Sequence, residues 1–311
     1  MRKLLVVTSM LFLASLFVAA ASIGGGGGGD RDRDHSRHGK GHKLKALVYH
    51  ETTGFRHPSI PYAIEQLTLW GAANGVEVTA DQTSARFTDR GLRKYDVVVW
   101  LSTVGGVRGD APLLTDGEWA AFQRYMRRGG GYAGIHAASD CCDESTWYGE
   151  LLGNQARFDS HPGGLGGSPG CIGSRPRELN RVGQTGSCFQ AVVVTEDGDH
   201  PSTRHLPERW NISDELYNFK ANPRSTVHVL QTLDESSYNF QPHPFIRGWG
   251  NLMGDDHPIT WCQIYEGARV WYTGLGHDAV IFAEHDSMGM ITRGILWSAG
   301  VGSTSGCRDE G

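Results

Sequence analysis

Histidines and acidic residues recur in short clusters at the ends of strand-like segments. His57 follows the first such segment, and His136 and Asp140 follow a later one. Glu215 and His277 lie in further clusters of the same kind. Because ligands bind beyond the carboxyl ends of strands in open α/β sheets, we expect these side chains to face one crevice. Imidazoles beside a carboxylate suit general acid–base chemistry or the binding of a metal ion.

Each cluster also has a purely structural interpretation. His57-Pro58 is typical of a turn, because proline holds the residue before it extended. Asp214-Glu215 could be a solvated pair, and Gly274–Gly276 could be a tight turn. The chemical interpretation depends on the joint occurrence of acidic residues with five histidines, namely His57, His136, His161, His257 and His277.

The apolar pattern of the first half predicts strands that alternate with helices. Strands are expected at 45–50, 76–80, 96–101 and 131–136, and helices at 59–74, 116–128 and 145–152. This alternation predicts an α/β fold with a doubly wound, mostly parallel sheet and helices on both faces.

The second half predicts a hairpin, a closing helix and two long loops. The hairpin strands are 259–265 and 269–275, with Glu266-Gly267 at the turn. Glycine-rich residues 158–186 and irregular residues 242–256 are expected to form the loops. The other expected elements are strands at 190–195 and 226–232, an extended segment at 210–217 and a helix at 288–299.

Length and composition are those of a globular protein. The chain has 311 residues, of which 39% are hydrophobic, and it is long enough to bury a sizeable core. The formal net charge of −5 provides no broad basic field, so we expect no nucleic-acid partner. Fourteen histidines and nine tryptophans are more suggestive, because histidine ligates metals and tryptophan offers a flat apolar surface to a sugar ring.

The amino terminus has the pattern of a secretory signal peptide. Arg2 and Lys3 precede the apolar run 4–20, and small residues at 19–21 resemble a cleavage site. The predicted location is therefore secreted or periplasmic, without stable membrane insertion after cleavage; a retained membrane anchor is the alternative. The predicted divisions of the chain are a signal peptide at 1–21, a flexible leader at 22–43, one domain at 44–300 and a tail at 301–311.

Six cysteines in an exported protein favour disulfides over thiol catalysis. Cys171 and Cys188 bracket a glycine-rich segment that a disulfide would stabilise, so we predict that they pair. The other four could pair in several ways, although the adjacent Cys141 and Cys142 are not expected to bond to each other. The sequence has no C-x-x-C pair, which disfavours a zinc ribbon.

Five motifs in order resemble the ThuA-like (trehalose utilisation) family. The resemblance extends from about Lys45 to Gly300. Any one motif is weak evidence, whereas five in the same order are specific. The motifs are Gly54-Phe55-Arg56-His57, Gly134-Ile135-His136-Ala137-Ala138-Ser139-Asp140, Asp214-Glu215-Leu216-Tyr217-Asn218-Phe219, His257-Pro258-Ile259-Thr260-Trp261 and Arg269-Val270-Trp271-Tyr272-Thr273-Gly274-Leu275-Gly276-His277.

This resemblance implies a class I glutamine amidotransferase-like fold and a link to sugar metabolism, with no well-defined reaction for most members. Amidotransferases carry a nucleophilic cysteine at a strained turn after the equivalent strand. Here His136 stands at that place, and Cys141 lies five residues later. Because imidazole cannot replace a thiolate in that role, we expect no glutaminase activity.

The clusters suggest roles for individual residues. Glu215 is the expected base for proton abstraction beside a sugar carbonyl, and His57, His136 and Asp140 would share the proton transfers or bind hydroxyl groups. Asp140 and Glu215 could also form the carboxylate pair of a glycoside hydrolase. The expected substrate-binding residues are Arg56, Tyr217, His257, His277 and Trp261.

The same side chains offer a second mechanism that uses a metal ion. His136, His161 and His277, with Asp140 or Glu215, could hold zinc or manganese, which would polarise the carbonyl group of a substrate. No tight spacing such as His-x-x-x-His enforces this site. Acid–base chemistry without a metal is therefore the alternative mechanism.

These patterns predict an exported enzyme that acts on a small glycoside or an oxidised (keto) sugar by isomerisation, elimination or hydrolysis. A non-catalytic carbohydrate-binding or accessory module is the alternative, because no nucleophile is evident and Trp147, Trp249 and Trp261 are candidates for exposure. A purely structural exported domain would leave the histidines unexplained.

Overall fold

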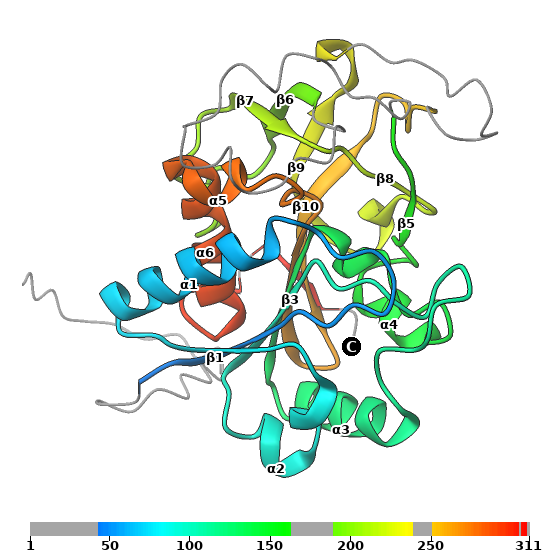
Figure 1. Cartoon of the computed structure of the whole chain (residues 1–311). Coiled ribbons are helices and arrows are strands. Elements are labelled where there is room, and N and C mark those ends of the chain that lie inside the picture. The colour runs from blue at the N-terminus through cyan, green and yellow to red at the C-terminus, as the bar shows by residue number, and fades with distance from the viewer. Residues whose placement is uncertain (1–42, 163–188, 239–250, 305, 310–311) are drawn as a thin grey trace, which may run out of the picture. The chain divides into compact units, whose positions relative to one another are not determined.

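The computed structural model describes residues 43–162, 189–238, 251–304 and 306–309. Within these residues a ten-stranded sheet runs in the order β2-β1-β3-β4-β11-β10-β9-β6-β7, and β12 pairs with β10 (Figure 1). A separate sheet pairs β5 (Phe158–Ser160) with β8 (Asn218–Phe219). The strands of the main sheet are β1 (Lys45–Tyr49), β2 (Glu77–Asp81), β3 (Val97–Leu101), β4 (Gly131–Ile135), β6 (Phe189–Thr195), β7 (Arg209–Asp214), β9 (His228–Asp234), β10 (Pro258–Tyr265), β11 (Ala268–Thr273) and β12 (Arg308–Asp309).

Half of the main sheet is parallel, with β2, β1, β3, β4 and β11 as consecutive neighbours. β3 reads Val-Val-Val-Trp-Leu and is buried along its whole length. Such continuous apolar runs are typical of parallel strands that helices cover on both faces. The strands predicted at 45–50, 96–101 and 131–136 agree with the structure to within one residue. The predicted doubly wound, mostly parallel sheet is therefore confirmed for the part of the fold that carries most of the site.

The rest of the sheet, β10, β9, β6 and β7, is paired antiparallel. β10 and β11 form the predicted hairpin, in which Glu266 and Gly267 have positive φ values of 50° and 80°. Positive φ at both turn residues is the requirement of a type I′ turn, which is why glycine suits the second position. The alternating exposure of β7 is typical of an antiparallel strand with one face in water.

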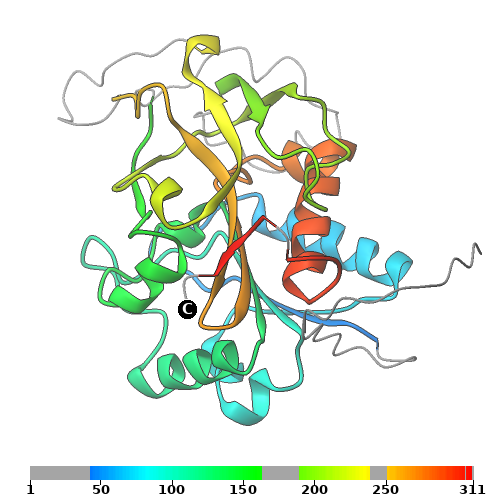
Figure 2. The ribbon, with the colours of Figure 1, turned by 180° about the vertical axis from the view of Figure 1, so that it is seen from behind.

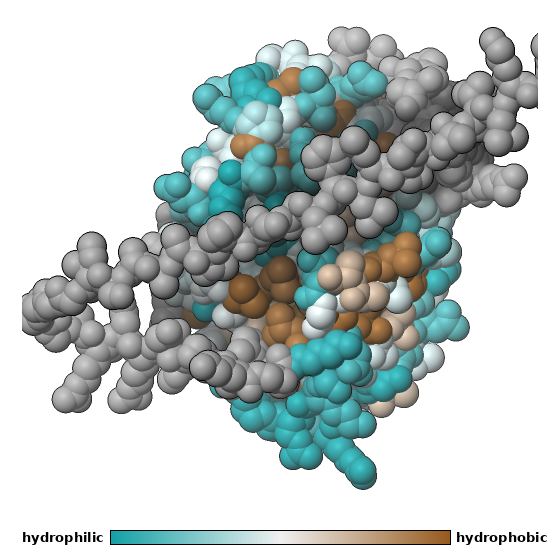
Figure 3. All heavy atoms as spheres, turned by 90° about the vertical axis from the view of Figure 1, so that its left-hand side faces the viewer, coloured by the Kyte–Doolittle hydropathy of each residue, from teal (hydrophilic) through white to brown (hydrophobic). Residues whose placement is uncertain are grey.

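Helices cover both faces of the sheet, as predicted (Figures 1 and 2). On one face lie α1 (Ile60–Asn74), α5 (Val280–Ala283) and α6 (His285–Ser298), and on the other α2 (Asp89–Leu92), α3 (Asp116–Arg127) and α4 (Thr146–Leu151). In the part of the chain that is described, none of these helices combines the length and apolar character needed to cross a membrane. Apolar residues also gather on the surface seen in Figure 3.

Among the described cysteines, Cys262 in β10 and Cys307 form a disulfide. This bond ties the end of the chain to the middle of the sheet, beside the pairing of β12 with β10. Cys141 and Cys142 are buried free thiols and, as expected, are not bonded to each other. The predicted Cys171–Cys188 bond and the predicted signal peptide lie outside the described residues.

His200 couples the stability of the fold to pH. The ring is 2% exposed, and Nδ1 accepts a hydrogen bond from the backbone N–H of Ser202, which requires that nitrogen to be unprotonated. Burial lowers the pKa of His200 to about 4. Because the unfolded chain takes up a proton near pH 6.5 and the folded protein does not, this contribution is complete above about pH 6.5 and is lost as pH falls toward 4.

We predict that wild-type protein loses about 3 kcal/mol more stability between pH 7 and pH 4 than the His200→Gln variant. Urea unfolding at several pH values measures the difference. Other buried histidines contribute equally to both proteins and cancel in the comparison. Parallel stability curves for the two proteins would contradict the assignment.

Candidate functional site

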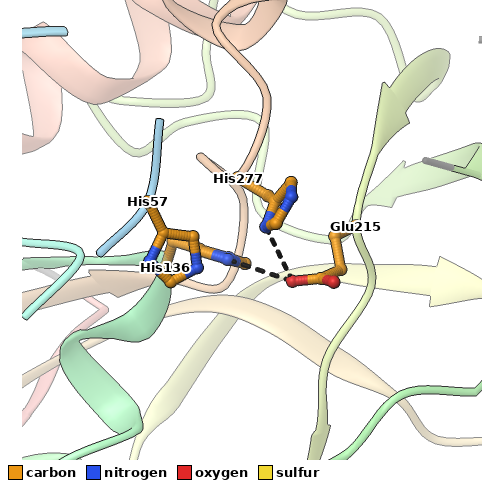
Figure 4. Close-up of side chains that lie close together, drawn as sticks. All are labelled: His57, His136, Glu215 and His277. Carbon is orange, nitrogen blue, oxygen red and sulfur yellow. Dashed lines mark ion pairs between the residues drawn. The ribbon is translucent and has the colours of Figure 1, made fainter. Parts of the chain in front are cut away.

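Four side chains converge at the carboxyl-end edge of the sheet (Figure 4). We refer to His57, His136, Glu215 and His277 as the histidine–glutamate cluster. His57 precedes α1, His136 follows β4, Glu215 follows β7 and His277 follows β11. The nitrogen and oxygen atoms that they offer all lie within 4.8 Å of one another. All four side chains are buried, so their polar atoms exert strong effects on one another.

β4 ends in a sharp turn at His136. This residue has a φ of 50°, and a 3₁₀ turn over His136–Ser139 begins there. A positive φ is uncommon for a residue other than glycine and stores strain at the turn. The Tyr272 hydroxyl donates to the carbonyl oxygen of His136 at 2.8 Å and so holds the turn in place. The turn presents an imidazole where an amidotransferase presents a thiolate, and the nearby Cys141 is fully buried.

The protonation of His136 follows from its hydrogen bond. Nδ1 lies 2.8 Å from the carbonyl oxygen of Gly274, which can only accept, so Nδ1 carries the proton. Burial lowers the pKa of His136 to about 4, and the ring is therefore neutral at pH 7. Its Nε2 then has a lone pair, which faces Oε2 of Glu215 at 3.4 Å. Two acceptor atoms thus face each other in a buried place.

Glu215 is the centre of the cluster. His277 Nδ1 lies 2.8 Å from Oε2 of Glu215, and His161 Nε2 lies 3.5 Å from Oε1. Burial alone would raise the pKa of Glu215, but the neighbouring imidazoles of His277 and His161 outweigh it and hold the pKa well below its usual range. For His277, burial is likewise outweighed by the Glu215 carboxylate, and the pKa is raised. Glu215 is therefore ionised, and its carboxylate holds the surrounding imidazole rings in position.

Asp214 positions the segment that carries His277. Its carboxylate is completely buried and accepts hydrogen bonds from the backbone N–H groups of Gly276, at 2.6 Å, and Asp278, at 2.8 Å. Burial raises the pKa of Asp214 to about 7. Gly276 has a φ of 132°, and a Cβ atom there would lie 2.8 Å from Cγ2 of Ile135. The segment can therefore pass this close to β4 only with glycine at this position.

Other predicted site residues lie around the cluster. The ring of Tyr217 packs on His136 with a centroid distance of 4.1 Å. Asp140 forms a two-point ion pair with Arg108 at 2.7 and 2.8 Å. Burial raises the pKa of Asp140, although Arg108 acts in the opposite direction. His161 lies against Glu215 but outside the four-residue group, which includes His57 instead.

Three predicted substrate-binding residues lie elsewhere. Arg56 donates to the carbonyl oxygen of His50 at 3.0 Å. The two ring nitrogens of His257 contact Glu235 and the carbonyl oxygen of Tyr217, at 2.9 and 2.8 Å, so this residue is structural. Trp261 is completely buried, and its Nε1–H donates to the carbonyl oxygen of Leu152. It belongs to the core and offers no surface to a sugar.

Sequence reasoning gave no individual role to Asp214, Arg108 or Phe55. Phe55 is 50% exposed and lies edge-to-face against His57, with ring centroids 4.8 Å apart. Arg108 follows β3, and the rule that places sites beyond strand ends could have nominated it. The role of Asp214 depends on a contact across 62 residues, which no local pattern reveals.

The sheet, its helices and the sharp turn at His136 define an α/β protein of the ThuA-like, glutamine amidotransferase-like fold. Solved structures that are similar to this chain include a ThuA-like protein from Bacteroides uniformis, with 21% identity and a TM-score of 0.62, and one from Parabacteroides merdae, with 17% identity and a TM-score of 0.58. The alignments cover 87% and 86% of this chain and 96% and 97% of those chains.

The chain belongs to the ThuA family, described as trehalose utilisation, whose model matches residues 45–298. The family expected from the five motifs is therefore confirmed. No curated protein matches the chain.

We predict that Asp214→Asn lowers the free energy of unfolding by about 2–4 kcal/mol. The amide retains one acceptor oxygen but turns an NH₂ group toward the second backbone N–H, which leaves buried donors without a partner. Chemical denaturation at pH 8 measures the loss. The matched control is Asp199→Asn at an exposed carboxylate, for which we expect a change within about 0.5 kcal/mol. Equal stabilities for the two variants would contradict the positioning role of Asp214.

Proposed function

We propose that this protein is an exported, sugar-directed enzyme that transfers protons on a small glycoside or an oxidised (keto) sugar, leading to isomerisation, elimination or hydrolysis. The observation that carries the proposal is the buried histidine–glutamate cluster at the carboxyl-end edge of the sheet. The family to which the chain belongs is described as trehalose utilisation, which supports a sugar as substrate. The secretory pattern of residues 1–21 supports export.

The cluster suits chemistry at a sugar oxygen. Within the cluster His277, whose pKa is raised, can donate to a carbonyl oxygen, whereas the Glu215 carboxylate and Nε2 of His136 can accept from a hydroxyl group. A stabilised carbonyl oxygen makes the hydrogen on the neighbouring carbon easier to remove. That step is common to the isomerisation of a sugar and to elimination from a keto sugar.

The residue that accepts the proton is better placed at the more exposed side of the cluster than at its buried centre. Glu215 was the expected base, but imidazoles surround it and keep it ionised, so it is a weak proton acceptor. The side chain of His161 is 14% exposed, compared with 6% for Glu215. We therefore assign the transferred proton to His161, with Asp140 and its partner Arg108 beside it.

Two partly exposed side chains that contact His57 and Asp140 support sugar binding. Half of Phe55 is exposed, and the ring offers an apolar face against which a pyranose could pack. The Arg108 side chain is 56% exposed, although it pairs with Asp140, and its guanidinium can donate to hydroxyl groups. Phe55 carries no charge, and Asp140 offsets the charge of Arg108, which fits a neutral glycoside.

The test is a panel of 3-keto-glycosides and unmodified disaccharides, followed by NMR and mass spectrometry. We expect turnover of at least one keto-glycoside, and a fall in kcat of about 100-fold or more for His161→Gln. The sugar affinity of this variant, measured by calorimetry, should stay within about threefold. The matched control is His285→Gln, since the side chain of His285 is 88% exposed and lies in α6.

Two outcomes would overturn the proposal. Sugar binding without turnover of any compound would identify a carbohydrate-binding module instead of an enzyme. Full activity of His161→Gln would remove this residue from the chemistry.

A further inference from the structure

We propose that His57, His136, Glu215 and His277 bind one divalent transition-metal ion, for which zinc or manganese has the appropriate ligand preference. The proposal concerns the same site as the proposed function, but it rests on ligand geometry and not on the identity of a substrate. His57 replaces His161 in the ligand set that the sequence suggested.

The spacing of the four donors matches a single ion. Ligand atoms bound to one zinc at about 2.1 Å are separated by about 3.4 Å in a tetrahedron and by at most about 4.2 Å. Oε2 of Glu215 lies 3.4 Å from Nε2 of His136 and 2.8 Å from Nδ1 of His277, and all four donors lie within 4.8 Å. A pair of donors at the 4.8 Å limit must close by about 0.6 Å to reach this upper separation and by about 1.4 Å to reach the tetrahedral one, whereas His277 and Glu215 must move apart by about 0.6 Å to reach the tetrahedral one.

The orientation of His136 is that of a metal ligand. A ligating histidine commonly donates its other ring N–H to a backbone carbonyl, which fixes the tautomer and aims the lone pair. The hydrogen bond from Nδ1 to Gly274 does so here. An ion between Nε2 and the Glu215 carboxylate would convert two facing acceptors into two ligands.

His57 provides an independent observation. Its Nδ1 is buried and, within the described residues, has no hydrogen-bond partner. Leaving a buried polar atom unsatisfied costs free energy, and a bound ion at this position would satisfy Nδ1 of His57. The ring of His57 packs edge-to-face against both His136 and His277, with centroids 4.8 and 5.1 Å apart. It therefore closes the group of donors from the side of α1.

The charge of the site also calls for a cation. In the described structure, the ion pairs of Glu215 are all with histidines. Burying a carboxylate is unfavourable unless an opposite charge pairs with it, and a divalent cation bound by all four side chains would supply that charge.

A second group provides a contrast within the same chain. His200, Cys262 and Cys307 also lie within 4.8 Å of one another, but the two sulfurs form a disulfide and offer no thiolate. His200 is buried like the cluster histidines. It is therefore the matched control for substitutions in the metal site.

The test measures metal binding without reference to activity. Protein stripped with a chelator is titrated with Zn²⁺ and Mn²⁺ by calorimetry, and with Co²⁺ by visible absorption. We expect one ion per chain, micromolar or tighter affinity for Zn²⁺, and Co²⁺ bands of a four- or five-coordinate site. His57→Gln and Glu215→Gln should each weaken Zn²⁺ binding at least 10-fold, whereas His200→Gln should leave it unchanged.

Circular dichroism of each variant confirms that weak binding does not reflect unfolding. Substoichiometric or millimolar binding to the wild-type protein, or unchanged binding to folded Glu215→Gln, would overturn the proposal. The two proposals fail separately: a metal-binding protein that turns over no sugar refutes only the function, and undiminished turnover by protein that binds no metal refutes only the metal site.

Discussion

The site depends on a carboxylate buried among imidazoles. Glu215 is 5% exposed, and His277, His136 and His161 lie within 3.5 Å of its oxygens. Burying a charge is unfavourable unless the surroundings compensate it, so the loops that bring these side chains together must be held firmly. Backbone contacts hold them, because the Gly274 carbonyl fixes His136 and the Asp214 carboxylate fixes the loop of His277. The sheet thus forces together groups that would separate in a more flexible protein.

Strands and turns were predictable wherever one local pattern decides the structure. The apolar run of β3 admits only a buried strand, and Glu266-Gly267 suits only a tight hairpin turn. The convergence of the cluster followed from one topological rule, namely that parallel strands end at the same edge. Trp261 and His257 were assigned to substrate because residue type does not distinguish a surface aromatic or imidazole from a buried one. The hydrogen bonds that Asp214 accepts from the backbone of Gly276 and Asp278 join segments that only the folded chain brings into contact.

The elbow at His136 shows how one backbone geometry can serve different chemistry. A strand that ends in a left-handed residue projects a side chain over the edge of the sheet, where amidotransferases use a thiolate. In this ThuA-family protein the projected group is a neutral imidazole whose second nitrogen is fixed by a backbone carbonyl. Such a group is a poor nucleophile and a good ligand or hydrogen-bond acceptor. The fold therefore determines where the side chain after β4 lies, and the neighbours of His136 determine its chemistry.

The central claim is that the cluster surrounds a cation. The most direct measurement is a crystal structure of zinc-equilibrated protein with diffraction data on both sides of the zinc absorption edge. The account predicts one anomalous peak, about 2.0–2.2 Å from a nitrogen of His57, His136 and His277 and from an oxygen of Glu215. The absence of a peak at this position, with the four side chains in contact only with one another, would contradict it.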